Sequence, residues 1–414
     1  MQAFLNVIRR LVYPAAALFL LWAGYQVIAR PYISENSGKI LAVYDGDSSI
    51  QNCNEDITPD KENQSEEALA GFCTAVKAAK NGPEVDLLNV HADLHDRIDG
   101  KSSGIYQQIA SRIARGSVLG VISFLTSPDS PPLIRFCRTM QIPLLLALAA
   151  NDNLMAPSED TRGIVFRMIP TNGRQAINIA DWLRERVQQY QRLRVALFHE
   201  PNSFGEFLHR QLTHELQPEL RDKKVLVYNF EVTERVEFAD LMPQLWCGKI
   251  DTIAYLGFAP RALDLLNQLG SYKADLDQVP CDSRSRSRSF GNLTVLLSSG
   301  AYQDDLNDGE KYTFPFKIFA MLPTRPGRRQ DANLTAANAL QDDVETDASE
   351  YGYDSYKLLE RLATDRFRIP SSQPIEHPKT GHEYRFDENG ELQPAEKNKY
   401  QAYPLVSSSL GRRS

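Results

Sequence analysis

The chain lacks the motifs that mark many nucleotide-binding and hydrolytic enzymes. Its 414 residues contain no Gly-x-Gly-x-x-Gly fingerprint, no Walker loop and no Gly-x-Ser-x-Gly elbow. A basic excess is also missing, because 53 aspartates and glutamates outnumber 46 lysines and arginines. Broad nucleic-acid binding needs a concentrated basic surface, so the composition argues against it.

Metal-binding spacings are equally scarce. No Cys-x-x-Cys pair occurs among the five cysteines, which argues against a structural zinc site. His91 and His95 are four residues apart, but no glutamate follows the first histidine and the pair lies at the end of a predicted strand. We therefore expect no metal and no other cofactor.

The first 30 residues differ from the rest of the chain. Arg9 and Arg10 precede the uncharged run 11–29, and Arg30 closes it. A helix of this length just spans a hydrocarbon core of about 30 Å. The run is interpreted either as an uncleaved membrane anchor or as a signal peptide with Val27-Ile-Ala29 as its cleavage site. Both interpretations export the body of the protein.

An exported body permits disulfides, and the odd number of cysteines leaves at least one unpaired. Cys53 and Cys73 are the expected pair, because they flank a polar loop and the start of the first predicted helix. Cys137 shares the apolar register of Leu133 and Ile134, where we expect a buried and inert thiol.

Short apolar runs alternate with amphipathic segments along the chain. The clearest unit is the run Val195–His199, followed by the polar turn 200–205 and the amphipathic segment 206–216. A similar unit occupies 252–269. Repeated strand, loop and helix predict parallel sheets with crossover helices, in which ligands bind beyond the carboxyl ends of the strands.

The same pattern extends over most of the chain. The expected strands are 39–44, 84–90, 119–124, 142–148, 163–168, 195–199, 224–232, 252–256, 292–297 and 313–322. The expected helices are 66–80, 103–115, one capped by Asp129 or Ser130, 175–189, 206–216, 238–246 and 261–269. The sequence Phe386–Gly390 predicts a hairpin turn. With about 150 residues per domain, the length suggests two to three domains.

The ordered set of loops resembles a type I periplasmic binding protein of the branched-chain amino-acid receptor kind. The resemblance covers about 38–405. The stretches that carry it are Phe124-Leu-Thr-Ser-Pro-Asp-Ser130, Leu148-Ala-Ala-Asn151, Phe166-Arg167 with Gln175, Gly205-Glu206, Tyr351-Gly-Tyr-Asp354 and the hairpin 384–392. It implies a two-lobed α/β fold, each lobe a parallel sheet flanked by helices, that closes on a small ligand.

The resemblance also implies a division of the chain. An anchor or signal peptide occupies 1–30, and a disordered tail occupies 406–414. The first lobe takes 31–168 with a return segment at about 304–349, and the second takes 169–303 with part of 350–405. Crossings between lobes are expected near 168–172 and 298–303, and the Arg-Ser repeat 283–289 is expected to be a solvated insertion.

Ligand contacts are implied in the loops after the strands of both lobes. The implied binding residues are Thr126, Ser127, Ala149, Asn151, Phe204, Gly257, Phe258 and Ser299, with Ser130 and Ala150 beside them. Ordinary structural roles compete with this assignment. Serine and threonine before a helix are often caps, Phe204 has a core alternative, and Asp45-Gly-Asp47 is interpreted as a plain turn.

One departure bears on the ligand. Receptors of this kind commonly carry an acidic residue on a late second-lobe loop, which pairs with the ligand ammonium. Here that region is Ser298–Gln303, and the acids Asp304 and Asp305 follow it. The pair Ala149-Ala150 also offers a carboxylate fewer hydrogen bonds than serine or threonine. Both features argue against an α-amino acid.

We therefore expect an anchored or secreted solute-binding protein, not an enzyme. Its partners would be a small polar ligand, such as an amino acid or a related compound, and an ABC permease or a membrane sensor. The alternative is a membrane-anchored interaction or regulatory module that reuses the fold without a small ligand.

Overall fold

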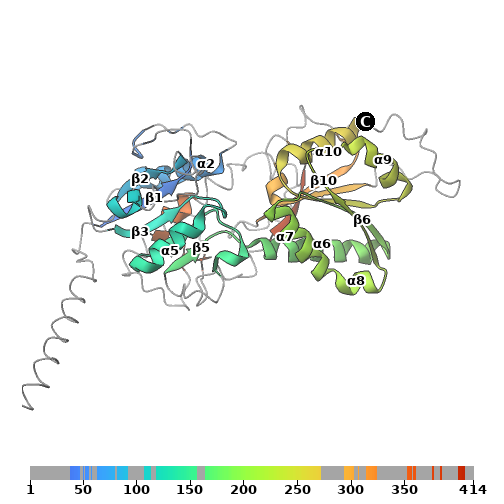
Figure 1. Ribbon diagram of the computed structural model, residues 1–414, viewed down its shortest axis with the longest axis horizontal. Coiled ribbons are helices and arrows are strands. Elements are labelled where there is room, and N and C mark those ends of the chain that lie inside the picture. The colour runs from blue at the N-terminus through green and yellow to red at the C-terminus, as the bar shows by residue number, and fades with distance from the viewer. Residues whose placement is uncertain are drawn as a thin grey trace, which may run out of the picture.

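Two sheets form the centres of two lobes, which lie side by side in the computed structural model (Figure 1). The structure describes residues 38–46, 50, 52–55, 57, 63–79, 82–91, 107–112, 118–155, 164–271, 293–302, 306, 314–323, 352–356, 358–359, 375–376, 383–384 and 400–405. The first sheet has the strand order β2-β1-β3-β4-β5, and the second has the order β13-β10-β9-β8-β6-β7. This is the two-lobed α/β architecture expected from the sequence.

The first sheet is parallel throughout. Its strands are β1 (Lys39–Tyr44), β2 (Glu84–Asn89), β3 (Val118–Ser123), β4 (Leu144–Leu146) and β5 (Val165–Arg167). From Ile40 to Tyr44 every residue of β1 is fully buried, because side chains pack on both faces of the sheet. Helix α2 (Gln64–Ala78) packs on one face, and α5 (Ser130–Met140) packs on the other.

The two first-lobe helices begin in different ways. The side chain of Asn63 caps α2 by accepting hydrogen bonds from the main-chain N–H groups of Ser65 and Glu66. Two prolines in the first turn begin α5, and Asp129 makes no capping bond. Ser130 donates its hydroxyl to the Thr126 carbonyl instead. Asp129 therefore occupies the N-cap position, as expected, but its side chain makes no capping bond.

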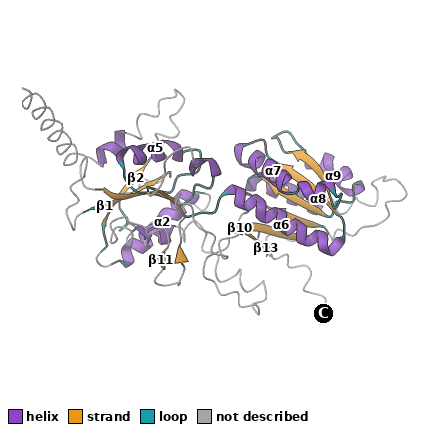
Figure 2. Ribbon diagram, turned by 90° about the horizontal axis from the view of Figure 1, so that it is seen from below, coloured by secondary structure: helices purple, strands orange, loops and turns teal. Residues whose placement is uncertain are grey.

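The second sheet combines parallel strands with one antiparallel edge strand. Its strands are β6 (Leu193–His199), β7 (Val225–Glu231), β8 (Thr252–Leu256), β9 (Thr294–Leu297), β10 (Lys317–Pro323) and the antiparallel β13 (Tyr400–Leu405). Helices α6 (Asn172–Tyr190), α7 (Ser203–Glu215) and α8 (Gln217–Arg221) cover one face (Figures 1 and 2). Helices α9 (Phe238–Cys247) and α10 (Ala259–Ser271) cover the other.

The C-terminal part of the chain returns to both lobes. Strand β10 lies beside β9 in the second sheet, so this part of 304–349 differs from the expected first-lobe return. Tyr356, Leu358 and Leu359 pack in the first-lobe core, where Tyr356 meets Phe72 edge to face. Apolar periodicity alone did not distinguish the lobes, because strands of both sheets are buried on both faces.

The first crossing between lobes follows β5, within the expected segment 168–172. There the N–H of Asn172 donates to the Ala150 carbonyl at 2.9 Å, and the N–H of Gly173 donates to Asp152 Oδ2 at 2.9 Å. A Cβ at Gly173 would lie 2.6 Å from Asp152 Oδ1, so a larger residue would displace the carboxylate that accepts this hydrogen bond. The start of α6 is thereby fixed to the loop after β4.

Several predictions fall outside the described residues. These are the anchor or signal peptide 1–30, the hairpin turn 386–390, the repeat 283–289, the tail 406–414 and the partner histidine His95. Beside that turn, β11 (Ile375–Glu376) and β12 (Glu383–Tyr384) pair antiparallel. Among the helices that the structure describes, none has the length and apolarity needed to cross a membrane.

The expected disulfide is confirmed. Cys53 is bonded to Cys73, which lies on α2. Cys137 is a free thiol in the first-lobe core, and burial raises its pKa, so it is unreactive as expected. Cys247 also belongs to a disulfide, whose partner lies outside the described residues.

Replacing both Cys53 and Cys73 by alanine should lower the free energy of unfolding by about 3 kcal/mol, because the unfolded chain regains the freedom of a closed loop. Urea unfolding without reductant measures the loss. As a control, thiol labelling of the denatured, unreduced parent chain should leave these two residues unmodified. Labelling at either cysteine would contradict the bond.

Candidate functional site

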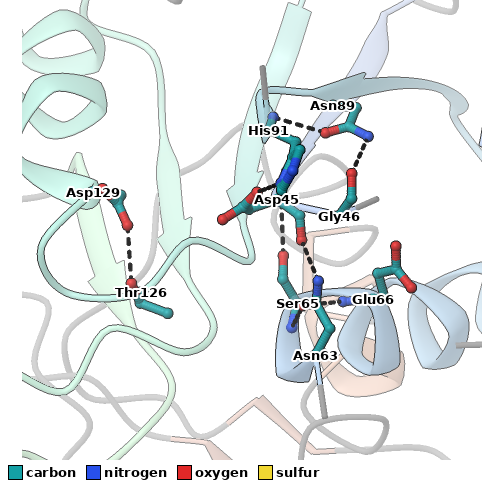
Figure 3. A network of polar contacts seen from close by, with 9 residues as sticks. All are labelled: Asp45, Gly46, Asn63, Ser65, Glu66, Asn89, His91, Thr126 and Asp129. Carbon is teal, nitrogen blue, oxygen red and sulfur yellow. Dashed lines mark hydrogen bonds and ion pairs between the residues drawn. The ribbon is translucent and has the colours of Figure 1, made fainter. Parts of the chain in front are cut away.

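Loops of the first lobe gather where the parallel strands end. Asp45 follows β1, His91 follows β2, Thr126 follows β3 and Asn151 follows β4. Figure 3 shows the first three among the polar contacts of this edge. Because parallel strands end at the same edge, residues far apart in sequence become neighbours here.

Asp45 and His91 form a hydrogen-bonded pair that the sequence analysis missed. His91 Nδ1 lies 2.8 Å from Asp45 Oδ1, and both side chains are about one-third exposed (Figure 3). The main-chain N–H of His91 donates to Asn89, whose amide donates to the Gly46 carbonyl. The adjacent strand ends β1 and β2 are thus tied together. The expected plain turn at Asp45 is part of a network.

The same loop is fixed to the start of α2. The N–H of Asp45 donates to the Ser65 hydroxyl at 2.9 Å, and the Asn63 amide donates to the Asp45 carbonyl at 3.1 Å (Figure 3). Asn63 therefore caps the helix and holds the strand end at once. The Asp45 carboxylate is positioned by main-chain contacts on a rigid element.

The two implied hydroxyls of the first lobe already have partners. Thr126 Oγ1 donates to Asp129 Oδ2 at 3.1 Å, and Ser127 Oγ accepts the N–H of Asn151 at 3.0 Å. The fully buried Arg167 donates to the Asn151 carbonyl at 2.8 Å. Ser127 and Asn151 are brought together as expected, and Ser127 links two loops. Ala149 lies beside them with its side chain buried.

Glu200 is the central residue of the second-lobe loops, and the sequence analysis gave it no role. Its Oε1 accepts from the Tyr255 hydroxyl at 2.7 Å and from the Phe258 N–H at 2.8 Å. Its Oε2 accepts from the Asn202 amide at 2.7 Å. The residue is only 9% exposed. Its carboxylate therefore joins the loop after β6 to the loop after β8.

Small residues let these loops meet. A Cβ at Gly257 would lie 2.5 Å from the Glu200 carboxyl carbon, so the buried acid requires glycine there. Ser298, at the end of β9, donates its hydroxyl to the Gly257 carbonyl at 3.0 Å. Three strand ends, those of β6, β8 and β9, are thereby joined.

An aromatic pair lies on these joined loops. The rings of Phe204 and Phe258 stack with centroids 5.3 Å apart, and Phe258 is 47% exposed. Gly300 contacts both, because a Cβ there would lie 3.0 Å from Phe204 Cε1 and 3.1 Å from Phe258 Cδ1. Ser299 precedes it in a short 3-10 turn. The implied second-lobe residues are thus brought together, and we call Phe204, Gly257, Phe258, Ser299 and Gly300 the aromatic cluster.

A pair of stacked histidines lies at the same edge. The His199 ring stacks on His209 of α7 with centroids 4.1 Å apart, and His209 Nε2 lies 3.0 Å from Asn229 Oδ1. Burial and the neighbouring His209 lower the pKa of His199, although Glu231 and Glu206 oppose that shift. His199 Nδ1 is buried and makes no hydrogen bond. A neutral imidazole suits this position.

The described residues bring together no group of three or more metal-ligating side chains. The arrangement instead offers hydroxyls, main-chain groups, the Asp45–His91 pair and one aromatic surface, all of which can bind a ligand. Whether the first-lobe loops face the aromatic cluster across a gap remains a prediction.

Comparison with solved structures identifies the architecture. A leucine-binding protein from Thermotoga maritima matches with a TM-score of 0.55 at 14% identity, over 86% of this chain and 93% of that one. The fold is that of the type I periplasmic binding proteins. An isoleucine-bound branched-chain amino acid transporter substrate-binding protein from Streptococcus pneumoniae matches at 0.54 and 12% identity, over 89% and 95% of the two chains.

A third structure of this fold is an ABC transporter substrate-binding protein from Desulfitobacterium hafniense in complex with leucine. It has a TM-score of 0.52 and 14% identity, over 88% of this chain and all of that one. No family model matches the sequence. No curated protein matches it either. At these identities the likeness concerns the fold.

Tyr255→Phe should lower the free energy of unfolding by about 1–3 kcal/mol, because it removes a donor from a buried carboxylate. Burial and the hydrogen bond to Glu200 raise the pKa of Tyr255, which keeps the hydroxyl protonated as the donor. Urea unfolding measures the change. Tyr228→Phe alters an exposed tyrosine on β7 as the control, and equal effects of the two substitutions would contradict the assignment.

Stability should fall as the pH drops below the ordinary histidine value of 6.5, because the pKa of His199 is lower than this in the folded state. The unfolded chain then takes up the proton first, until folded His199 is protonated as well. His199→Phe keeps a ring against His209 and should flatten this part of the profile.

Urea midpoints measured between about pH 8 and pH 5 give that profile. His214→Gln, which removes an exposed histidine from α7, controls for the loss of one titrating side chain. A profile that is unchanged by His199→Phe would show that His199 carries none of the pH dependence.

Proposed function

We propose that the chain is an extracytoplasmic solute-binding protein, which captures a small ligand between its two lobes for ABC-type transport or for sensing. The observation that carries this proposal is that each lobe has a cluster of loops at the carboxyl ends of its parallel strands. Such edges are where ligands bind in open parallel sheets. Two proteins of similar structure were solved in complex with leucine or isoleucine, which supports the binding of a small ligand.

The proposed ligand contacts come from both lobes. In the first lobe they are the hydroxyls of Thr126 and Ser127, the side chain of Asn151 and the main chain at Ala149. In the second they are the rings of Phe204 and Phe258 and the main chain at Gly257 and Ser299. The role is binding and not catalysis, since a receptor of this kind needs shape, hydrogen bonds and closure.

The proposal includes motion and location. One proposed hinge is the segment 168–171, between β5 and α6. The lobes would close about it. The uncharged run 11–29 supports a location of the body outside the cytoplasm, either anchored or released. An ABC permease or a membrane sensor would then receive the closed form.

A thermal-shift screen of the full-length chain with amino acids, amides, small acids and sugars tests this function. A ligand at a hundredfold excess over its Kd should stabilise the folded chain by about 2.7 kcal/mol, because it binds only the folded state. If no compound of any class shifts the melting temperature, the solute-binding function is wrong, and the alternative of an interaction module gains support.

Removing the Ser127 hydroxyl should weaken binding of the ligand found in that screen by about fivefold to 150-fold, the equivalent of about 1–3 kcal/mol. Ser127→Ala should also lower stability, since its hydroxyl holds the N–H of Asn151. Calorimetry therefore has to compare Kd values below the melting temperature of each variant. Ser111→Ala is the matched control, because that hydroxyl bonds within its own helix. Equal affinity in both variants would exclude Ser127.

A further inference from the structure

The aromatic cluster is an exposed ring surface placed where a ligand of this fold would lie. Phe258 stands just after β8 with nearly half of its surface exposed, and Phe204 supports it from the first turn of α7. Scattered exposed apolar residues are ordinary in soluble proteins. Here, however, loops from three strands converge on the two rings, which gives them a fixed position.

Glu200, the acid beside this surface, is used inside the protein. All three of its hydrogen bonds come from protein donors, and one of them is the main-chain N–H of Phe258. Gly257 also packs directly against the carboxyl group. The charge therefore positions the Phe258 ring and is not offered to a ligand ammonium.

Arg261, in the first turn of α10, is also bonded to groups within the protein. Its guanidinium donates to the carbonyls of Thr233 and Val236 and to the Asp264 carboxylate, and it lies over the Phe238 ring. These contacts belong to the β7–α9 connection and to α10. Arg261 and Asp264 thus pair with each other, and the contacts of the Arg261 guanidinium include neither Phe204 nor Phe258.

We propose that this second-lobe surface binds the planar, uncharged ring of a small aromatic compound, and that Phe258 is the residue that selects it. The inference rests on the solute-binding function proposed above and names the class of solute. Stacking against two phenylalanines favours an aromatic ring over a saturated ring of the same size, because of the preferred geometries of aromatic pairs. An ammonium group stacked on these rings would lose hydration without gaining the Glu200 carboxylate, which already bonds to protein donors.

Matched probes separate ring recognition from recognition of the polar end. The aromatic probes are phenylalanine, phenylacetate and 2-phenylethylamine, and each is paired with its cyclohexyl counterpart. Calorimetry on the full-length chain should detect at least one aromatic probe. It should bind about threefold to tenfold more tightly than its saturated counterpart, which is the usual range for aromatic pairing.

Variants of Phe258 then assign that preference to the surface. Phe258→Ala should weaken binding of the aromatic probe by about tenfold. Phe258→Tyr, which keeps the ring, should change the affinity little. Tyr228→Ala removes another exposed aromatic side chain of the same lobe and should leave binding unchanged. Phe258 is half exposed, so its replacement should be tolerated by the fold, and urea unfolding of each variant verifies this.

The outcomes distinguish this inference from the function it rests on. If leucine or another aliphatic solute binds and Phe258→Ala leaves its affinity unchanged, the aromatic class is wrong and the solute-binding function stands. The same holds if each aromatic probe binds no better than its cyclohexyl counterpart. If no compound of the probe set or of the wider screen binds at millimolar concentration, both the inference and the function are wrong.

Discussion

Parallel pairing of strands is the constraint on which both loop clusters depend. Because β1 and β2 run in the same direction, Asp45 and His91 leave the first sheet at one edge and reach each other there. In the second sheet the register aligns His199 with Leu256 and Tyr255 with Leu297. The residues that follow, Glu200, Gly257 and Ser298, must then share a small space. That crowding explains why one of them is a glycine and why the other two bond to their neighbours.

Glu200 holds these crowded loops in fixed positions through its hydrogen bonds. A buried carboxylate is unfavourable unless donors surround it, and here a hydroxyl, a main-chain N–H and a side-chain amide do so. The N–H belongs to Phe258, so satisfying the acid also fixes the start of α10. First-lobe loops are ordered by a different means, in which Ser127 and Arg167 bind the main chain of Asn151. In both lobes the polar groups closest to the strand ends bond to neighbouring loops and hold them in place.

The sequence predicted what depends on local pattern. Strand and helix order, the disulfide from Cys53 to Cys73 and the approximate positions of the site loops all follow from apolar periodicity and turn residues. Pairing across strands was beyond it, since neither the contact of Asp45 with His91 nor that of Glu200 with Tyr255 has a local signature. The start of α7 at Ser203 was missed by three residues, although Asn202 is a common capping residue. Strand β10 was misplaced because burial on both faces looks alike in either lobe.

The chemistry of the two lobes differs, and this difference constrains any ligand that touches both. The first-lobe edge carries the hydrogen-bonded pair Asp45 and His91 together with hydroxyls, so a polar group finds partners there. On the second-lobe edge Glu200 and Arg261 bond to protein groups, and Phe258 exposes its ring beside them. A ligand spanning these edges would keep its polar end at the first lobe and its apolar end at the second. The second lobe contains an acid, Glu200, but its carboxylate is buried and holds the loop that carries the Phe258 ring. The chemistry that the second lobe offers a ligand therefore depends on the orientation of the Glu200 carboxylate. The presence of an acid in the sequence does not by itself predict it.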